Sequence, residues 1–509
     1  MRVTILVVQT VLLLHRMLAA GGEAQGNLAA RPGLAQAFER NPWLQDYAQL
    51  KARLEQSYSN LAWFASPQGG VDLPALDRRT KRSLLAAENE EDAKAALLGF
   101  IAGFHDGHLA RVETLLPAKG PAADPPAPEW DRLSAVDGCA ALGYAPVRSI
   151  PFSLPFETLN GAAMESDGIS RPFRAATLTS ARGRKLGIVR IARFREQDSP
   201  PSLCVQEWTA QKQSAGHIDP DVLKEKITTA WFRALADQLA RFQKERVSAV
   251  IVDVGGNSGG NDTGDWATRL FTPREVHSAR LYMCASPAAE GYFNEQLEEL
   301  RRALEEHPGA SPKAIAALRA ALARFEQRKA GLAARKCDMS WVWREQRPWN
   351  LAGSSRLVEA GFFSGERDYM PPGDLGDEGL ATKIYWAASV DPFRGAWSGP
   401  VYVLTDGRTA SSAEMFAAVL RDNGIAKIVG ERTAGDGGGF MFTESPVELH
   451  HSRLRFRLPN CVRLRADGTN EVAGIKPDIP VLPLQGEGPR SRAARLLEMV
   501  DLDLGTLSK

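Results

Sequence analysis

The chain has 509 residues, a length that corresponds to roughly two to four domains. Hydrophobic residues make up 44% and charged residues 24%, so the composition excludes a disordered chain, a collagen and a multi-span membrane protein. The 62 basic and 61 acidic residues give a net charge of +1. The chain therefore has no large excess of positive charge that would hold nucleic acid or an anionic membrane. The five cysteines are too few for a disulfide scaffold.

The first residues have the pattern of a secretory signal peptide. A positive start at Arg2 precedes a mostly apolar run over residues 3–14 and small residues over 18–24. The run is shorter than a membrane-spanning helix requires. We therefore expect residues 1–24 to be removed, and the mature protein to be periplasmic or extracellular without stable membrane insertion. An N-terminal membrane anchor is the alternative.

A helical region, a linker and an α/β region follow. Apolar residues at helical spacing predict an N-terminal helical domain over 30–116, and the Pro- and Ala-rich residues 117–130 predict a linker. Further along, an apolar strand at 186–191 and a continuous apolar strand at 247–254 are typical of a covered sheet. We expect 131–285 to form the first part of an α/β core.

The middle of the chain has a different composition. Residues 288–334 are rich in Ala, Glu, Arg and Leu, with one break, and predict an inserted hairpin of two helices within a hairpin-and-lid region over 286–395. Cys284 and Cys337 stand at the two feet of this hairpin. A disulfide between them would contribute about 3–4 kcal/mol by closing the loop; two free thiols are the alternative.

The α/β pattern returns after the insertion. A strand–turn–helix–strand pattern covers 401–429, and further strands are predicted within 447–482. Together they predict the second part of the core over 396–485, followed by a C-terminal tail over 486–509.

Ser411 lies where the apolar strand at 401–404 gives way, through a turn, to a helix that begins near Ser412. The first N–H groups of a helix are unpaired and lie at the positive end of its dipole, so they would stabilise an oxyanion formed beside Ser411. A simple helix cap is the alternative role for either serine.

Two other segments carry groups of chemical interest. The Gly-rich loop at 253–261 can offer backbone N–H groups to an anion, although a tight turn is the alternative and the loop matches neither a phosphate-binding nor a dinucleotide motif. His105 and His108 are three residues apart, but no further ligand follows at metal spacing, so we expect no metal and no cofactor. A single histidine brought near a serine would act as a general base.

These segments, in this order, resemble the tail-specific, or carboxyl-terminal-processing, family of serine peptidases. The matching motifs are Asp253 to Gly260 (with Gly255 where an Arg is common), Thr409 to Glu414, Gly430 to Gly435 and Glu471 to Asp478. The resemblance implies an α/β fold with a ClpP/crotonase-like peptidase core. It implies Ser411 as the nucleophile, with an oxyanion hole formed by the backbone N–H groups of Gly259, Gly260 and Ser412.

The family divides by its general base. The processing branch uses a Ser–Lys dyad, but here Asp436 stands in the place of the lysine. The chain is more similar to the branch of the tricorn protease core, which uses Ser–His with a carboxylate. This similarity implies His108 as the base and Glu471 as its acidic partner, with Asp436 and Asp478 as rivals.

The resemblance as a whole implies an exported serine peptidase that hydrolyses peptide bonds through an acyl-enzyme intermediate. Its partners would be peptides or unfolded proteins, because no carboxylate-binding PDZ loop is recognisable and the inserted hairpin would limit entry. An inactive binding protein on the same fold, holding a hydrophobic ligand or peptide, is the main alternative, and hydrolysis of a non-peptide ester is another. The sequence carries no signal for an oligomeric state.

Overall fold

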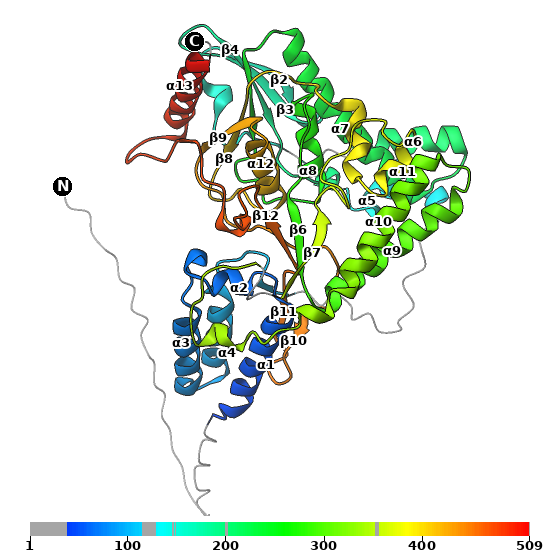
Figure 1. The fold of residues 1–509 in the computed structure, drawn as a ribbon. Helices are drawn as coiled ribbons and strands as arrows, with labels where there is room; N and C mark the ends of the chain where they lie inside the picture. Colours follow the sequence, from blue (N-terminus) through cyan, green and yellow to red (C-terminus); the bar gives the residue numbers. More distant parts are fainter. Residues whose placement is uncertain are drawn as a thin grey trace, which may run out of the picture. The chain divides into compact units, whose positions relative to one another are not determined.

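The protein is described by a computed structural model (Figure 1). The described residues are 38–113, 129–144, 147, 149–198, 202–351 and 356–507. The expected signal peptide and most of the expected linker lie outside them. One compact unit begins at Arg40 and runs to the end of the chain. Within the described ranges, no helix is both long enough and apolar enough to cross a membrane.

The N-terminal region is helical, as predicted. Its helices are α1 (Asn41–Ser57), α2 (Leu61–Phe64), α3 (Leu73–Ala86) and α4 (Glu90–Ala102). The side chains of Asp72 and Asn89 accept hydrogen bonds from the first turns of α3 and α4 and so set where these helices begin. Edge-to-face aromatic contacts, such as Tyr47 with Phe100, fill the space between the helices.

A short antiparallel sheet joins this helical region to the end of the chain. Strand β1 (Ala110–Arg111) pairs with β11 (Arg455–Arg457), which also pairs with β10 (Val447–Glu448). The residues between α4 and β1 are therefore held beside a strand that lies more than three hundred residues later in the sequence.

A seven-stranded sheet forms the centre of the α/β core, with the order β13-β9-β8-β5-β4-β3-β2. Strands β4, β5, β8, β9 and β13 run parallel, and β2 and β3 add an antiparallel edge. Every residue of β5 is buried, as its continuous apolar sequence predicts. The bounds are β2 Ala162–Asp167, β3 Arg174–Thr179, β4 Lys185–Arg190, β5 Ala249–Asp253, β8 Val401–Thr405, β9 Ala426–Gly430 and β13 Ile479–Pro480.

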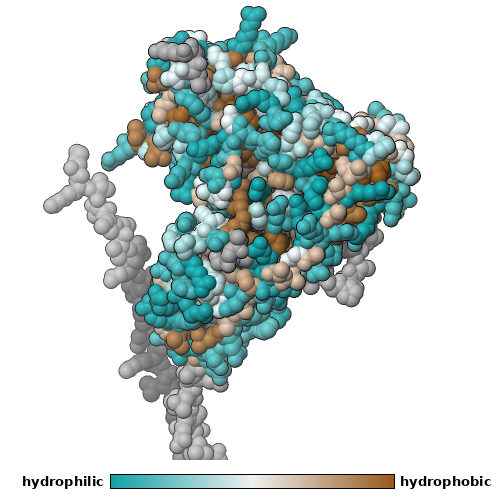
Figure 2. All heavy atoms as spheres, in the orientation of Figure 1, coloured by the Kyte–Doolittle hydropathy of each residue, from teal (hydrophilic) through white to brown (hydrophobic). Residues whose placement is uncertain are grey.

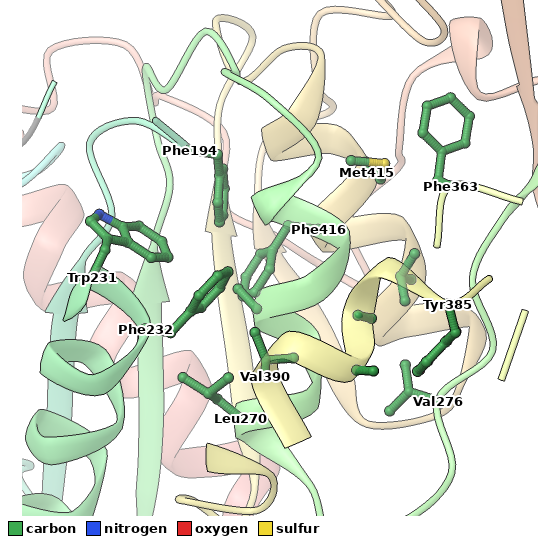
Figure 3. Close-up of a cluster of buried hydrophobic side chains, with 14 of the residues drawn as sticks. Phe194, Trp231, Phe232, Leu270, Val276, Phe363, Tyr385, Val390, Met415 and Phe416 are labelled. Carbon is green, nitrogen blue, oxygen red and sulfur yellow. The ribbon is translucent and has the colours of Figure 1, made fainter. Parts of the chain in front are cut away.

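Helices cover both faces of this sheet. Helices α7 (Pro220–Lys244) and α12 (Ser412–Asp422) contribute to the larger buried cluster, part of which is drawn in Figure 3. Helix α13 (Pro489–Leu507) contributes Leu496 and Val500 to the smaller cluster, which also contains Ile251 of β5. The residues that we expected to form a C-terminal tail are therefore largely part of the core.

A second three-stranded sheet, of order β12-β6-β7, lies beside the helical hairpin. It contains β12 (Cys461–Leu464), β6 (Arg280–Cys284) and β7 (Leu357–Phe362). Helices α9 (Pro287–Glu306) and α10 (Pro312–Ala330) lie side by side in Figure 1 and are separated by a short turn, as the break in the sequence predicts. The face drawn in Figure 2 is mostly hydrophilic, with hydrophobic side chains gathered in smaller areas.

The suspected disulfide between Cys284 and Cys337 is wrong. Cys139, on α5 (Ala135–Ala141), is instead bonded to Cys204, on α6 (Ser202–Ala215). Both hairpin cysteines are free thiols. Cys284 is directed at the backbone carbonyl of Gln56 on α1, and burial raises its pKa to about 12, whereas Cys337 is exposed. Cys284 and Cys337 flank the hairpin in the sequence, but their thiols are not bonded to each other in the folded protein.

Candidate active site

Ser411 occupies a strained turn between β8 and α12. Its φ of 54° and ψ of −120° are rarely adopted by a residue with a side chain. Two neighbouring groups hold this backbone. The N–H of Ser411 donates to the carboxylate of Glu414 over 3.0 Å, and its carbonyl accepts from the guanidinium of Arg463 over 2.9 Å. The turn therefore presents the hydroxyl in a conformation that its surroundings enforce.

The helix that follows Ser411 is anchored in the core. The ring of Phe416 on α12 packs against Phe194 and Phe271, at centroid distances of 5.1 and 5.5 Å. Figure 3 shows Phe416 among Phe194, Phe232 and Val390. Because the first turn of α12 cannot move independently of the core, the position of Ser411 is fixed relative to the sheet.

His108 meets Ser411 as the sequence predicts. Its Nε2 lies 3.1 Å from Oγ of Ser411, and its Nδ1 lies 3.1 Å from Oδ1 of Asp436. The same carboxylate oxygen accepts the backbone N–H of His108 over 2.9 Å. His105 is exposed. A Ser–His–carboxylate row of this kind has the geometry for proton abstraction from the hydroxyl.

The turn that carries His108 is tied down on both sides. The guanidinium of Arg457, on β11, donates to the carbonyls of Gly107 and His108. On the other side, Asp106 is buried and accepts the backbone N–H of His108 and the hydroxyl of Tyr58 over 2.9 and 2.6 Å. The pairing of β1 with β11 thus places the imidazole, and these contacts fix its direction.

Asp436 is ionised at neutral pH. Burial raises the pKa of this carboxyl, but the hydrogen bond and charge of His108 lower it by more. The net pKa therefore lies below the ordinary value. Its backbone N–H, like that of Gly435, donates over 2.8 Å to Glu414. The carboxylate of Glu414 therefore joins the backbones of Ser411 and Asp436. Burial, together with the charge of Glu471, raises the pKa of Glu414 to about 7.

Glu471, which we expected beside His108, lies elsewhere. Its buried carboxylate accepts two hydrogen bonds from Arg463, at 2.9 Å from Nε and 2.5 Å from the terminal nitrogen. A buried carboxylate requires such a partner, because leaving it unpaired costs several kcal/mol. Arg463 in turn donates to the carbonyl of Ser411, so Glu471 supports the nucleophile turn through this guanidinium. The carboxylate that faces His108 is that of Asp436.

The Gly-rich loop after β5 lies against the nucleophile turn. A Cβ on Gly259, whose φ is +97°, would lie 2.6 Å from Cβ of Ser411, so only glycine fits. The N–H of Gly259 is already used, because it donates to Oδ1 of Asn257 over 2.8 Å. No described residue accepts the N–H groups of Gly260 or Ser412. Of the three expected oxyanion donors, these two are available.

One cluster in the described ranges has metal-ligand character. Ligand atoms of Asp106, His108 and Asp436 lie within 4.8 Å of one another. The oxygens of Asp106 already accept from Tyr58 and from the backbone of His108, and Nδ1 of His108 lies 3.1 Å from Oδ1 of Asp436. These contacts hold the turn that carries His108.

Sequence reasoning missed three parts of this site. Asp106 belongs to the D-G-H motif and Glu414 to the nucleophile motif, so both were visible in the sequence without a role. Arg463 had no motif signal at all. It becomes relevant only because β12 lies beside the turn of Ser411.

Comparisons with known proteins identify the family of this chain and structures that share its fold. The model of peptidase family S41 matches residues 185–481. Among solved structures, mature CPAF superposes with a TM-score of 0.55 at 17% identity, covering 92% of this chain and 98% of that chain. Mature CPAF complexed with lactacystin gives 0.57 at 16% identity, with 92% and 99% covered. No curated protein matches the sequence.

At these identities the solved structures show a shared fold, and the family match, which spans more than half of the chain, identifies the relationship. The expected α/β peptidase core is confirmed. The chain belongs to peptidase family S41, a family of serine peptidases.

Proposed function

We propose that this protein is an exported peptidase that cleaves peptide bonds through an acyl-enzyme on Ser411, with His108 as general base and Asp436 as the carboxylate that orients it. The observation that carries the proposal is the continuous row from Oγ of Ser411 to Nε2 of His108 and from Nδ1 to Asp436, with 3.1 Å at each step. For His108 to act as the base, Nδ1 would carry the proton that faces Asp436, and Nε2 would then be free to accept the proton of the hydroxyl.

Acylation follows from this arrangement. As Nε2 of His108 takes the hydroxyl proton, Oγ of Ser411 bonds to the carbonyl carbon of the substrate, whose oxygen becomes negative. The N–H groups of Gly260 and Ser412 would hold that oxygen, and removal of one such donor typically costs about 3 kcal/mol of transition-state stabilisation. His108 then passes the proton to the leaving amine, and the peptide bond breaks.

Deacylation uses the same groups in reverse. A water molecule takes the place of the leaving amine, His108 accepts one of its protons, and the resulting oxygen bonds to the acyl carbon. The bond to Oγ then breaks and the proton returns to Ser411, so that the free carboxyl product leaves and the enzyme is restored.

Export is supported by two observations. The first residues read as a signal peptide, and the disulfide between Cys139 and Cys204 belongs to the chemistry of an oxidising compartment. The substrates we propose are peptides or unfolded protein segments, because a scissile bond must reach a serine that is itself only partly exposed.

The test is cleavage of a reduced, unfolded protein and of a mixed peptide library. The wild-type protein should cleave both, whereas Ser411→Ala and His108→Ala should cleave neither. His105→Ala, which changes an exposed histidine three residues away, is the matched control and should keep its activity. Binding of peptides without any cleavage by the wild type would favour the binding-protein alternative and contradict the proposal.

A further inference from the structure

The side chain of Phe440 lies at the edge of the candidate active site. Its ring makes a T-shaped contact with the imidazole of His108, with centroids 5.8 Å apart and an interplanar angle of 87°. It nevertheless leaves 42% of its surface exposed, and it is the only phenylalanine among the exposed large hydrophobic side chains of the described part of the chain. A partly exposed aromatic side chain therefore adjoins the base of the triad.

This ring is held in place. The guanidinium of Arg457 lies 5.6 Å from the ring centroid, and the same guanidinium is tethered to the carbonyl of His108. The backbone on both sides of Phe440 is bonded to Asn460: Gly439 accepts the backbone N–H of Asn460 over 2.9 Å, and Met441 donates to its side chain over 2.9 Å. The exposed face is thus fixed relative to His108.

The exposure of Phe440 is not a property of the whole segment. Two residues later, Phe442 packs beneath the start of α9, where a Cβ on Gly291 would lie 2.4 Å from its ring. The carbonyl of Phe442 accepts from the side chain of Asn460 over 2.7 Å. Phe442 therefore fixes the segment to the hairpin, whereas Phe440 remains partly exposed beside His108.

The direction of proton transfer in the triad determines which part of a substrate would lie beside Phe440. Nε2 of His108 must deliver a proton to the leaving amine, so the residue that follows the scissile bond lies beside Nε2. A Cβ on Gly439 would lie 3.5 Å from Nε2, which puts the segment from Gly439 to Phe440 at that side. The oxyanion donors, Gly260 and Ser412, belong to other segments.

We propose that Phe440 forms the wall of the subsite for the residue directly after the scissile bond, so that the peptidase prefers substrates with a large apolar or aromatic side chain at that position. This inference rests on the proposed function for the direction of the substrate. The physical basis is the removal of two apolar surfaces from water, together with the preference of aromatic rings for edge-to-face and offset contact.

The experiment compares two peptides that differ only in the residue after the scissile bond, Phe in one and Gly in the other. We expect kcat/KM of the wild type to favour the Phe peptide by about tenfold or more, the usual scale for one apolar contact. Phe440→Ala should bring this ratio close to one, and Phe440→Leu should keep most of it. Val136→Ala, which shortens an exposed apolar side chain on α5, should not change the ratio.

A binding measurement separates this inference from the proposed function. The Ser411→Ala protein binds without turnover, so its affinities for the two peptides can be compared even if the wild type cleaves neither. An affinity ratio that favours Phe and that Phe440→Ala removes would support the subsite. Equal affinities, or a ratio that Phe440→Ala leaves intact, would overturn it, whatever the cleavage assay gives.

Discussion

The substitution Asp436→Asn tests which carboxylate serves His108. The change removes the negative charge but keeps a side-chain oxygen that can still accept the backbone N–H of His108, so the turn should keep its shape. The charge matters most when Nε2 has taken the serine proton and the imidazole is positive. Asn, with its oxygen in the place of Oδ1, keeps the contact to the backbone N–H but carries no charge to stabilise that cation.

The expected magnitude follows from the distance. Oδ1 of Asp436 lies 3.1 Å from Nδ1, and the two side chains are only 15% and 13% exposed. Two unit charges at that separation interact by about 5 kcal/mol at an effective dielectric constant of about 20. Each 1.36 kcal/mol is a factor of ten in rate, so we expect kcat to fall by about four orders of magnitude.

The assay is steady-state cleavage of a fluorogenic peptide near pH 8, with circular dichroism to check the fold. Asp467→Asn, which neutralises an exposed carboxylate in the loop after β12, is the matched control and should keep full activity. If folded Asp436→Asn retains more than about a tenth of the wild-type kcat, then Asp436 is not the orienting carboxylate and the assignment fails.

Three further outcomes are expected from other parts of the molecule. Glu471→Gln should lower the free energy of unfolding in urea by about 3–5 kcal/mol, because it leaves the guanidinium of Arg463 buried without its anion; an unchanged midpoint would contradict this. Replacing Cys139 and Cys204 by serine opens a loop that spans 65 residues and should cost about 4 kcal/mol in the same assay; a loss below 1 kcal/mol would show that the bond adds little. Because the pKa of Glu414 is raised to about 7 from an ordinary 4.5, the folded protein holds this proton where the unfolded chain has lost it. Its contribution to stability should therefore fall by about 3 kcal/mol as the pH rises through that window, and Glu414→Gln should remove that part of the slope; parallel pH profiles for the two proteins would refute it.

The regular elements were accessible from the sequence because local patterns determine them. The N-terminal helices, the buried strand before the Gly-rich loop and the strand–helix junction at Ser411 all appear where periodicity and apolar runs predict them. The approach of His108 to Ser411 was also predicted, but only through the resemblance to a family. No local pattern indicates that β1 pairs with β11.

The carboxylate that faces His108 and the cysteine pairing could not be predicted from local patterns, because each depends on which side chains face each other in the folded chain. Glu471 lies in the expected segment, but β12 places Arg463 beside it, and the two buried side chains form an ion pair. Asp436 reaches His108 because Glu414 binds the backbone N–H of Asp436 and thereby fixes its loop. Cys139 lies on a short helix that packs against α6, a contact between two helices whose sequences carry no pairing signal.

The central claim is that the hydroxyl of Ser411 is a nucleophile activated by His108. The most direct measurement is the intact mass of the folded protein after reaction with a fluorophosphonate, followed by peptide mapping of the adduct. We expect one adduct per chain, carried by the peptide that contains Ser411, and its absence in both Ser411→Ala and His108→Ala. Labelling of the wild type at a rate no higher than that of the two variants, or an adduct on another residue, would contradict the account.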